Sequence, residues 1–451
     1  MILRMVFTIN TALAALALAP GAALAQGQMP VPSAAPAPGA PPRAEPPVVL
    51  PPSATPLVAP PAAASEQQGP AIDVPSERDM PQMTLPRETA IENPLRQQSS
   101  ASATAIGGYG ELTLNAPAIG PSVIDLRRLV LFVGHNFNDR IRFYSELEVE
   151  HAVASSTDQG EFEVEQAYLD GLFTRHFNLR AGLIIMPVGI INVYHEPPTF
   201  NGVDRPDVDV LVIPSTWREA GFGAFGEITE GLSYQVYLTS GFNANGFTAE
   251  SGIAEGHQEA QLASASTFGA VARLTYEPML ATIVGVSAYG GTSGNTLHDT
   301  VGNVPLGLFE ADARTRYRGF SARAELAFLF IGDTAALNTA FTTGTPEQMG
   351  AIAVASQLRG GYVEAGYDVL RLLAPGTAQD LTVFFRYDYA NTQAAVAAGF
   401  TANPAFIRYT ETVGLVYRPI REVGLKADYR RHEFGAGPSY NELATALTWM
   451  F

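Results

Sequence analysis

Cysteine is absent from the 451 residues, which excludes a disulfide scaffold and any thiolate-ligated metal centre. Charged residues are scarce, at 16% of the chain against roughly 25% in an ordinary soluble domain. Acidic residues outnumber basic ones, 44 to 27, and the formal net charge is −17. A chain this acidic lacks the basic face that displaces counterions from nucleic acid, so nucleic acid is not an expected partner.

Apolar runs long enough to span a membrane as a helix are also missing. The first 25 residues carry Arg4, an apolar run from Val6 to Leu18, and an A-x-A pattern ending at Ala25. This is the pattern of a secretory signal peptide that is cleaved near Ala25. The alternative is an N-terminal anchor, but the run is shorter than the ~20 residues of a spanning helix and Pro20 interrupts it. We therefore expect export.

Aromatic residues are absent from residues 26–100, where proline, alanine, serine and glutamine dominate. Such a segment cannot bury enough apolar surface to offset its chain entropy. The sequence predicts a disordered Pro/Ala-rich tail over 26–104, followed by one domain over 105–451. The tail is interpreted as a linker, and the alternative is a spacer that crosses the periplasm and touches peptidoglycan.

The second part of the chain alternates apolar and polar residues in segments of about ten. In one such segment, Ile141, Phe143, Leu147 and Val149 alternate with a set of charged residues. Period two with unlike faces indicates strands between two different environments. Long and short connections also alternate along the chain, as in transmembrane β-barrels. The predicted fold class is all-β, a transmembrane antiparallel β-barrel of about 16 strands.

Fifteen strands follow directly from this pattern, and 14 or 18 strands are the alternatives to sixteen. An even count requires one further strand, assigned to 334–342, while 346–357 is interpreted as a short helix and 291–315 as a loop. In the fourth strand, Phe162 and Val164 share a parity that would turn Tyr168 and Asp170 outward. We expect a bulge near Gln166 to restore the inward direction.

The last strand has apolar residues at alternate positions and ends on an aromatic residue. Leu443, Leu447, Trp449 and Phe451 share one face. This is similar to the assembly signal of outer-membrane barrels, and it implies recognition of the terminal Phe451 strand by the barrel assembly machinery. The expected location is the bacterial outer membrane, with its lipid around the barrel.

Several stretches resemble the phosphate-selective porin O/P family. The resemblance runs over 106–451 and is carried by Tyr168-Leu169-Asp170, Met186-Pro187-Val188-Gly189, Ile213-Pro214-Ser215-Thr216-Trp217 and Gly361-Tyr362-Val363-Glu364. It implies 16-stranded homotrimers that let small anions, notably phosphate, cross the outer membrane. That family's sites also use several lysines, whereas this chain has one, Lys426.

Anion selectivity requires guanidinium or ammonium groups on the lumen side. Eight residues are candidates for the pore lining. Strand parity assigns seven of them, Arg142, Arg180, Arg273, Arg323, Arg386, Lys426 and Arg430, and the eighth, Arg218, starts a strand beside the long loop. The alternative is that each is neutralised by a neighbouring carboxylate, as for Arg323 with Glu325, Arg386 with Asp388 and Lys426 with Asp428.

The connection from Ile190 to Trp217 is the expected constriction loop. Its candidate residues are His195, Glu196, Asp204, Arg205, Asp207 and Asp209. Folded inward, they would line the narrowest part of the pore; otherwise they are solvated on a surface loop. Carboxylates could hold Ca²⁺, but their spacing does not match an EF-hand, so no metal is expected.

Enzymatic motifs are also missing. The seven histidines show no H-E-x-x-H spacing, and no G-x-S-x-G or phosphate-cradling glycine loop occurs. We therefore expect no enzyme and no cofactor, but a porin for passive diffusion of small hydrophilic solutes. The alternatives are a general or cation-preferring porin, a structural barrel that tethers the envelope, and a soluble secreted β protein.

Overall fold

The computed structural model describes residues 103–451 except 156–158, 280, 295–300 and 343–352. The predicted signal peptide (1–25) and residues 26–102 of the predicted tail lie outside this part. The last two residues assigned to the tail, Ala103 and Thr104, already belong to the first strand.

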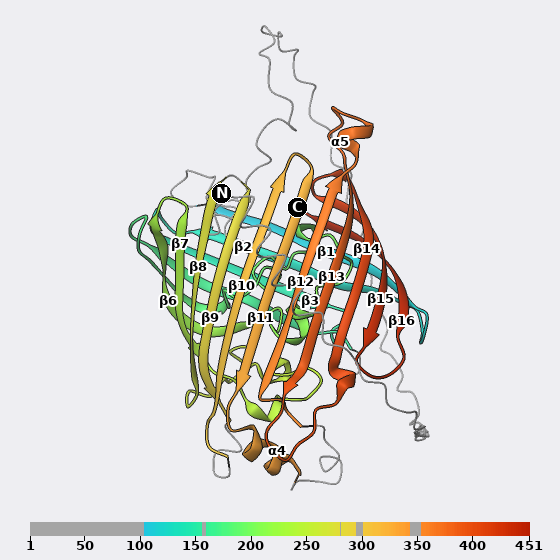
Figure 1. The fold of residues 1–451 in the computed structure, drawn as a ribbon. Coiled ribbons are helices and arrows are strands. Elements are labelled where there is room, and N and C mark those ends of the chain that lie inside the picture. Colours follow the sequence, from blue (N-terminus) through green and yellow to red (C-terminus); the bar gives the residue numbers. More distant parts are fainter. Residues whose placement is uncertain (1–102, 156–158, 280, 295–300, 343–352) are drawn as a thin grey trace, which may run out of the picture. The chain divides into compact units, whose positions relative to one another are not determined.

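Sixteen strands form one closed antiparallel barrel, in which each strand pairs with its neighbours in sequence and β1 pairs with β16 (Figure 1). The predicted fold class is confirmed. The strands are β1 (Ala103–Pro117), β2 (Val123–Asn136), β3 (Ile141–Glu150), β4 (Phe162–Leu172), β5 (Asn178–Ile185), β6 (Arg218–Thr229), β7 (Leu232–Ser240), β8 (Phe268–Met279), β9 (Thr282–Ser293), β10 (Val304–Tyr317), β11 (Phe320–Ile331), β12 (Gln357–Asp368), β13 (Asp380–Ala395), β14 (Ile407–Ile420), β15 (Val423–Phe434) and β16 (Tyr440–Met450).

The alternating sequence pattern sorts side chains between the two faces of this barrel. Apolar residues such as Leu131, Leu238 and Leu415 point outward and are exposed, whereas Glu148 and Arg430 point inward and are buried. An apolar outer face around a polar interior is the arrangement of barrels that lipid surrounds.

Two of the predicted elements near residue 300 are wrong, and their errors cancel in the strand count. Residues 334–342 form helix α4 (Thr334–Thr342) instead of a strand. The strand that completes the count of sixteen is β10, most of which was assigned to the loop 291–315. At the start of β10 the usual alternation is lost, because Leu306 and Leu308, which are buried inside the barrel, are as apolar as the outward Pro305 and Phe309. These inward residues belong to a buried cluster that also includes residues of the connection between β5 and β6.

The expected helix at 346–357 is not formed where the structure can test it. Residues 346–352 lie outside the described part, 353–356 are not helical, and β12 begins at Gln357.

The predicted bulge in β4 is present. Glu146 pairs with Gln166 and the next residue, Leu147, pairs with Val164, so Glu165 has no residue opposite it. Beyond this point Tyr168 and Asp170 are buried inside the barrel, while Phe162 and Val164 remain exposed outside.

The two rims of the barrel carry connections of different length. Tight turns and the helix α5 (Leu370–Leu373) occupy one rim, and the longer connections, including α4, occupy the other (Figure 1). Within the described residues, no helix combines the length and the apolar character that spanning a bilayer requires.

Candidate functional site

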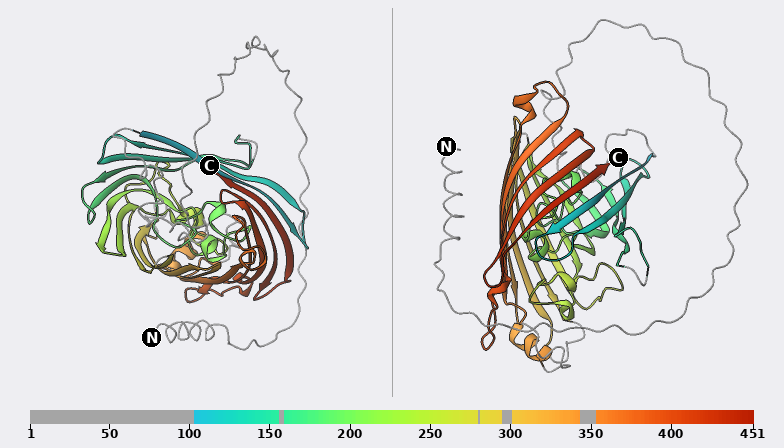
Figure 2. Two further views of the ribbon diagram at one scale, coloured as in Figure 1. Left: turned by 90° about the horizontal axis from the view of Figure 1, so that it is seen from above. Right: turned by 90° about the vertical axis from the view of Figure 1, so that its right-hand side faces the viewer.

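The connection between β5 and β6, residues 186–217, lies inside the barrel. Seen along the barrel, its short helices η2 (Pro197–Thr199) and α3 (Val208–Leu211) lie within the ring of strands (Figure 2). We call this connection the lumen loop. Its apolar residues Ile190 and Ile213 are buried in a cluster that includes Leu306 and Leu329 of the inner wall. This burial explains why the loop folds inward.

A glycine lets the lumen loop turn inward at its start. Gly189 has a φ of +79°, and a Cβ there would lie 2.6 Å from the Oε1 atom of Glu325 and 3.1 Å from Ile213. Any side chain would therefore be strained in conformation and would also clash. The backbone N–H of the next residue, Ile190, donates to Glu325 at 3.0 Å.

Asp204 attaches the lumen loop to three strands. It accepts hydrogen bonds from Arg127 of β2 at 2.5 Å, from Asn115 of β1 at 3.1 Å, and from Arg430 of β15. Burial would raise the pKa of Asp204, but the two guanidinium groups hold this pKa well below its usual range. The carboxylate is thus ionised and bonded at neutral pH.

Backbone carbonyls of the lumen loop bind two of the predicted pore-lining residues. Lys426 donates to the carbonyls of Pro197 and Gly202 at 2.7 and 2.8 Å, and Arg323 donates to the carbonyl of Thr199. Their expected pairing with neighbouring carboxylates does not occur, because Glu325 and Asp428 accept backbone N–H groups of the loop instead.

Five other predicted pore-lining residues do pair with carboxylates. The pairs are Arg180 with Asp170, Arg218 with Glu163 and Glu259, Arg273 with Glu310 and Asp312, Arg386 with Asp388, and Arg430 with Asp204 and Asp428. The remaining one, Arg142, is half-buried on the inner side, and its Nε forms no hydrogen bond within the described residues. Seven of the eight lie at inward-facing positions, whereas Arg218, the first residue of β6, shares the strand parity of the outward Phe222. The role of these residues in ion selection stays a prediction.

Two acidic residues of the lumen loop lie against β13 and β14. The Thr410 hydroxyl donates to Asp207 at 2.8 Å, and the Asp207 N–H donates to Asp388 at 3.3 Å. Asp209 is fully buried; burial and then the charge of Asp388 raise its pKa to about 8, against the opposing charge of Arg205.

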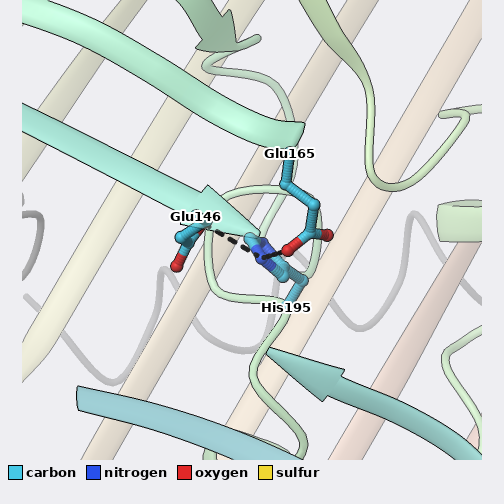
Figure 3. Close-up of side chains that lie close together, drawn as sticks. All are labelled: Glu146, Glu165 and His195. Atoms are coloured by element: carbon cyan, nitrogen blue, oxygen red, sulfur yellow. Dashed lines mark ion pairs between the residues drawn. The ribbon is translucent and has the colours of Figure 1, made fainter. Parts of the chain in front are cut away.

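His195, Glu196 and Arg205 approach the opposite wall. Glu165 and Glu146 lie 3.7 and 3.9 Å from the Nε2 atom of His195 (Figure 3). Burial lowers the pKa of His195, but these two carboxylates outweigh it and raise that pKa. Glu196 lies within electrostatic reach of the same histidine.

Arg205 stands among acidic residues of β1, β3 and β4. Burial and the nearby Arg128 lower its pKa to about 10, so it is still protonated at neutral pH. The carboxylates of Glu165, Glu148 and Glu111 oppose this effect.

Arg316 and Arg418 are among the lumen-facing arginines that sequence reasoning missed. Arg316 of β10 is exposed, and Arg418 of β14 is half-buried and donates to the carbonyl of Pro198 at 3.3 Å. Both lie within electrostatic reach of Arg323. Parity along β14 could have identified Arg418, whereas Arg316 was hidden because β10 itself was assigned to a loop.

Solved structures share this fold. The chain is similar to OmpF of Salmonella typhi in complex with daunomycin, at 13% identity and a TM-score of 0.54, over 77% of this chain and 97% of that one. An anion-selective porin from Comamonas acidovorans (10% identity, TM-score 0.50) and the outer-membrane channel DcaP of Acinetobacter baumannii (12%, 0.50) match 78% of this chain and 100% and 99% of theirs. The fold is therefore that of the 16-stranded porin barrels of bacterial outer membranes.

Comparison of sequences identifies a relative of the chain. No family model matches the chain, so the resemblance to the phosphate-selective porin O/P family stays a prediction. A protein of Aquifex aeolicus (strain VF5), described as uncharacterized, is 34% identical over 352 residues, covering 77% of this chain and 80% of the relative. The chain belongs to the same family as this Aquifex protein.

Proposed function

We propose that the chain forms a channel in a bacterial outer membrane through which small hydrophilic solutes diffuse passively. Barrels of sixteen strands are wide enough to hold water, whereas eight-stranded barrels are filled by side chains. The apolar outer face and the charged inner wall fit lipid outside and water inside. The lumen loop, anchored from both sides, is the proposed constriction, and no catalytic role is proposed for the barrel.

We also propose that this channel prefers small anions, phosphate among them. The observation that carries this proposal is the group formed by Arg316, Arg323 and Arg418 beside the lumen loop. Within the described residues, this group forms one ion pair, between Arg418 and Asp380 at 3.6 Å. Arg316 is exposed, and a cavity of about 20 Å³ beside it is also lined by Asn201 of the loop. Guanidinium groups can bind two phosphate oxygens at once.

The test is the zero-current potential of the purified protein in a planar bilayer across a KCl gradient, with and without phosphate. We expect an anion-selective potential and a chloride current that phosphate reduces. In Arg316→Glu the potential should shift toward cations, because the substitution reverses the charge of an exposed arginine in the lumen.

The matched control is Arg431→Glu, which makes the same charge change on an exposed arginine that pairs with Glu433 at 2.5 Å. This variant should keep the wild-type potential. A cation-selective wild-type protein without phosphate effect would retain the channel and reject the anion preference. No conductance at all would reject the channel and favour a structural barrel whose lumen the loop closes.

The route to the membrane and the assembly state belong to the same proposal. We propose cleavage near Ala25, recognition of the strand ending at Phe451 by the barrel assembly machinery, and a homotrimer of barrels preceded by the Pro/Ala-rich tail. Light scattering of the detergent-solubilised protein gives the number of chains, and mass spectrometry of the mature protein gives its first residue.

A further inference from the structure

The wall formed by β1, β3 and β4 gathers more acidic groups than its basic residues can neutralise. Glu146, Glu148 and Glu165 are buried there, and Glu111 joins them from β1. Arg128 of β2 contacts two of these four carboxylates, Glu111 at 3.0 Å and Glu148 at 3.7 Å, and Arg205 of the lumen loop is the second guanidinium nearby. Buried carboxylates without a counter-charge are costly, so a further cation would stabilise this part of the wall.

His195 of the lumen loop points an unpartnered nitrogen into this acidic group. Its side chain is 2% exposed, and its Nε2 atom forms no hydrogen bond within the described residues. The other ring nitrogen, Nδ1, lies 3.3 Å from the carbonyl oxygen of Asn192, to which it can donate. This contact leaves Nε2 as the ring nitrogen that faces Glu146 and Glu165 (Figure 3). A cation bound at Nε2, either a proton or a metal ion, would balance the charge of these two carboxylates.

The separations are too long for direct hydrogen bonds and suit an intervening ion. Nε2 lies 3.7 Å from the Oε2 atom of Glu165 and 3.9 Å from the Oε2 atom of Glu146. Two ligand atoms that each lie about 2.1 Å from one ion are at most ~4.2 Å apart. A single ion can therefore bind Nε2 together with either carboxylate oxygen. A tetrahedral angle needs these atoms to approach by only a few tenths of an ångström. By contrast, His432 and Glu442 lie 3.2 Å apart, where a shared proton suffices.

The surrounding residues already orient the two carboxylates. The Tyr144 hydroxyl donates to Glu146 at 2.9 Å, Gln166 donates to the same carboxylate, and the Tyr109 hydroxyl donates to Glu165 at 3.2 Å. Metal ligands in proteins are commonly held by such outer hydrogen bonds, including one from the second ring nitrogen of histidine to a carbonyl.

The bulge in β4 explains why Glu165 is available at this place. Glu165 is the residue without an opposite partner, inserted between Val164 and Gln166. Without Glu165, the inward and outward residues of β4 would alternate regularly. The bulge therefore adds one inward carboxylate to the strand without changing the direction of its neighbours. Bulges often re-aim a side chain next to a functional site.

We propose that Glu146, Glu165 and His195 bind a divalent transition-metal ion of the Zn²⁺ kind that ties the lumen loop to the barrel wall. One imidazole nitrogen and two carboxylate oxygens suit Zn²⁺, whereas Ca²⁺ takes six to eight oxygen ligands. The site joins β3 and β4 to the loop, on the side of the lumen opposite β11. It does not depend on which solutes pass.

The test uses the full-length protein in detergent, stripped with a chelator and then equilibrated with ZnCl₂ alone. Metal analysis after desalting should find one zinc ion per chain, and CaCl₂ or MgCl₂ should leave none. Zinc should also raise the unfolding temperature, because it binds the folded state. In His195→Ala and Glu165→Gln, zinc affinity should fall about tenfold or more. His432→Ala is the matched control and should bind zinc as the wild type does.

Two outcomes would overturn the proposal. One is a wild-type protein that retains no zinc, which would leave a proton as the cation at His195. The other is equal zinc binding by the wild type and His195→Ala. Glu165→Gln keeps the side-chain volume and removes a buried charge, so it remains a folded test even where His195→Ala does not assemble. Co²⁺ in place of Zn²⁺ gives an absorption spectrum that reports nitrogen and oxygen ligands directly.

Discussion

Asp209 shows how a single buried carboxyl can make the lumen loop sensitive to pH. It lies within electrostatic reach of the carboxyls of Asp388 and Glu325 and of the guanidinium groups of Arg205 and Arg386. Burial is the largest effect on its pKa, which rises to about 8. A carboxyl with a raised pKa in the folded state binds more protons there than in the unfolded chain, so stability falls as pH rises between the two pKa values.

Raising the pH from 6 to 9 should therefore destabilise the wild-type protein, by an amount on the order of a few kcal/mol. The contribution of Asp209 is present in acid and is lost between about pH 4, its unfolded pKa, and about pH 8. Asp209→Asn should lose this part of the pH dependence. The measurement is the midpoint of urea unfolding in detergent micelles at both pH values. Equal pH slopes in the two proteins would show that Asp209 does not titrate in this range.

Strand β4 shows that a bulge can be predicted from the sequence, whereas the contacts of its inserted residue cannot. The sequence predicted a bulge near Gln166 from the parity conflict alone, and the structure confirms it at Glu165. What the sequence could not show is the partner of this carboxylate, because His195 comes from a loop thirty residues later and reaches Glu165 only through the folding of that loop into the lumen.

Deleting Glu165 should leave the barrel folded and remove the proposed zinc site. Val164 and Gln166 would then be consecutive and would pair with Leu147 and Glu146 without interruption. Phe162 and Val164 would still point outward. We expect the folded protein to keep its resistance to SDS at room temperature and its stability within about 1 kcal/mol, because loss of a bulge restores regular pairing. Gel mobility before and after heating checks this. Deletion of Ala272 in β8, where the ladder with β7 has no bulge, should instead disrupt assembly by reversing strand faces.

The whole barrel separates charge across its lumen. Acidic residues predominate on β1, β3 and β4, whereas basic residues outnumber the acidic Glu310, Asp312, Glu325 and Asp428 on the inner face of β10, β11, β14 and β15; β3 and β11 lie eight strands apart in the ring of sixteen. The lumen loop connects the two sides, since His195 faces Glu165 and Thr199 accepts from Arg323. The net charge of −17 therefore does not describe the surface that a passing ion meets.

Salt should weaken the proposed anion preference. The Debye length is about 10 Å at 0.1 M salt and about 3 Å at 1 M, so the field of the Arg316 group reaches across the lumen only at low salt. The ratio of anion to cation permeability should be largest in 0.1 M KCl and approach that of a neutral pore in 1 M KCl. Zero-current potentials at constant gradient and rising mean concentration measure it. A ratio independent of salt would mean that direct binding at the constriction sets the preference.

From the residue order alone, the all-β barrel and the inward direction of seven basic residues could be predicted. These follow from period-two alternation, which depends on local residue order and on the contrast between lipid and water. It failed at β10 and α4, because there the inner wall faces apolar loops instead of water, and the contrast that the pattern reports disappears.

Which groups meet inside the lumen depends on the folding of the lumen loop and could not be predicted. Asp204 reaches Arg430 across 226 residues of chain, and Lys426 binds carbonyls of Pro197 and Gly202 instead of Asp428. Such contacts depend on how the lumen loop folds against strands distant in sequence, which no local pattern encodes. The same loop brings His195 to Glu146 and Glu165, so the proposed metal site exists only once the barrel has closed around it.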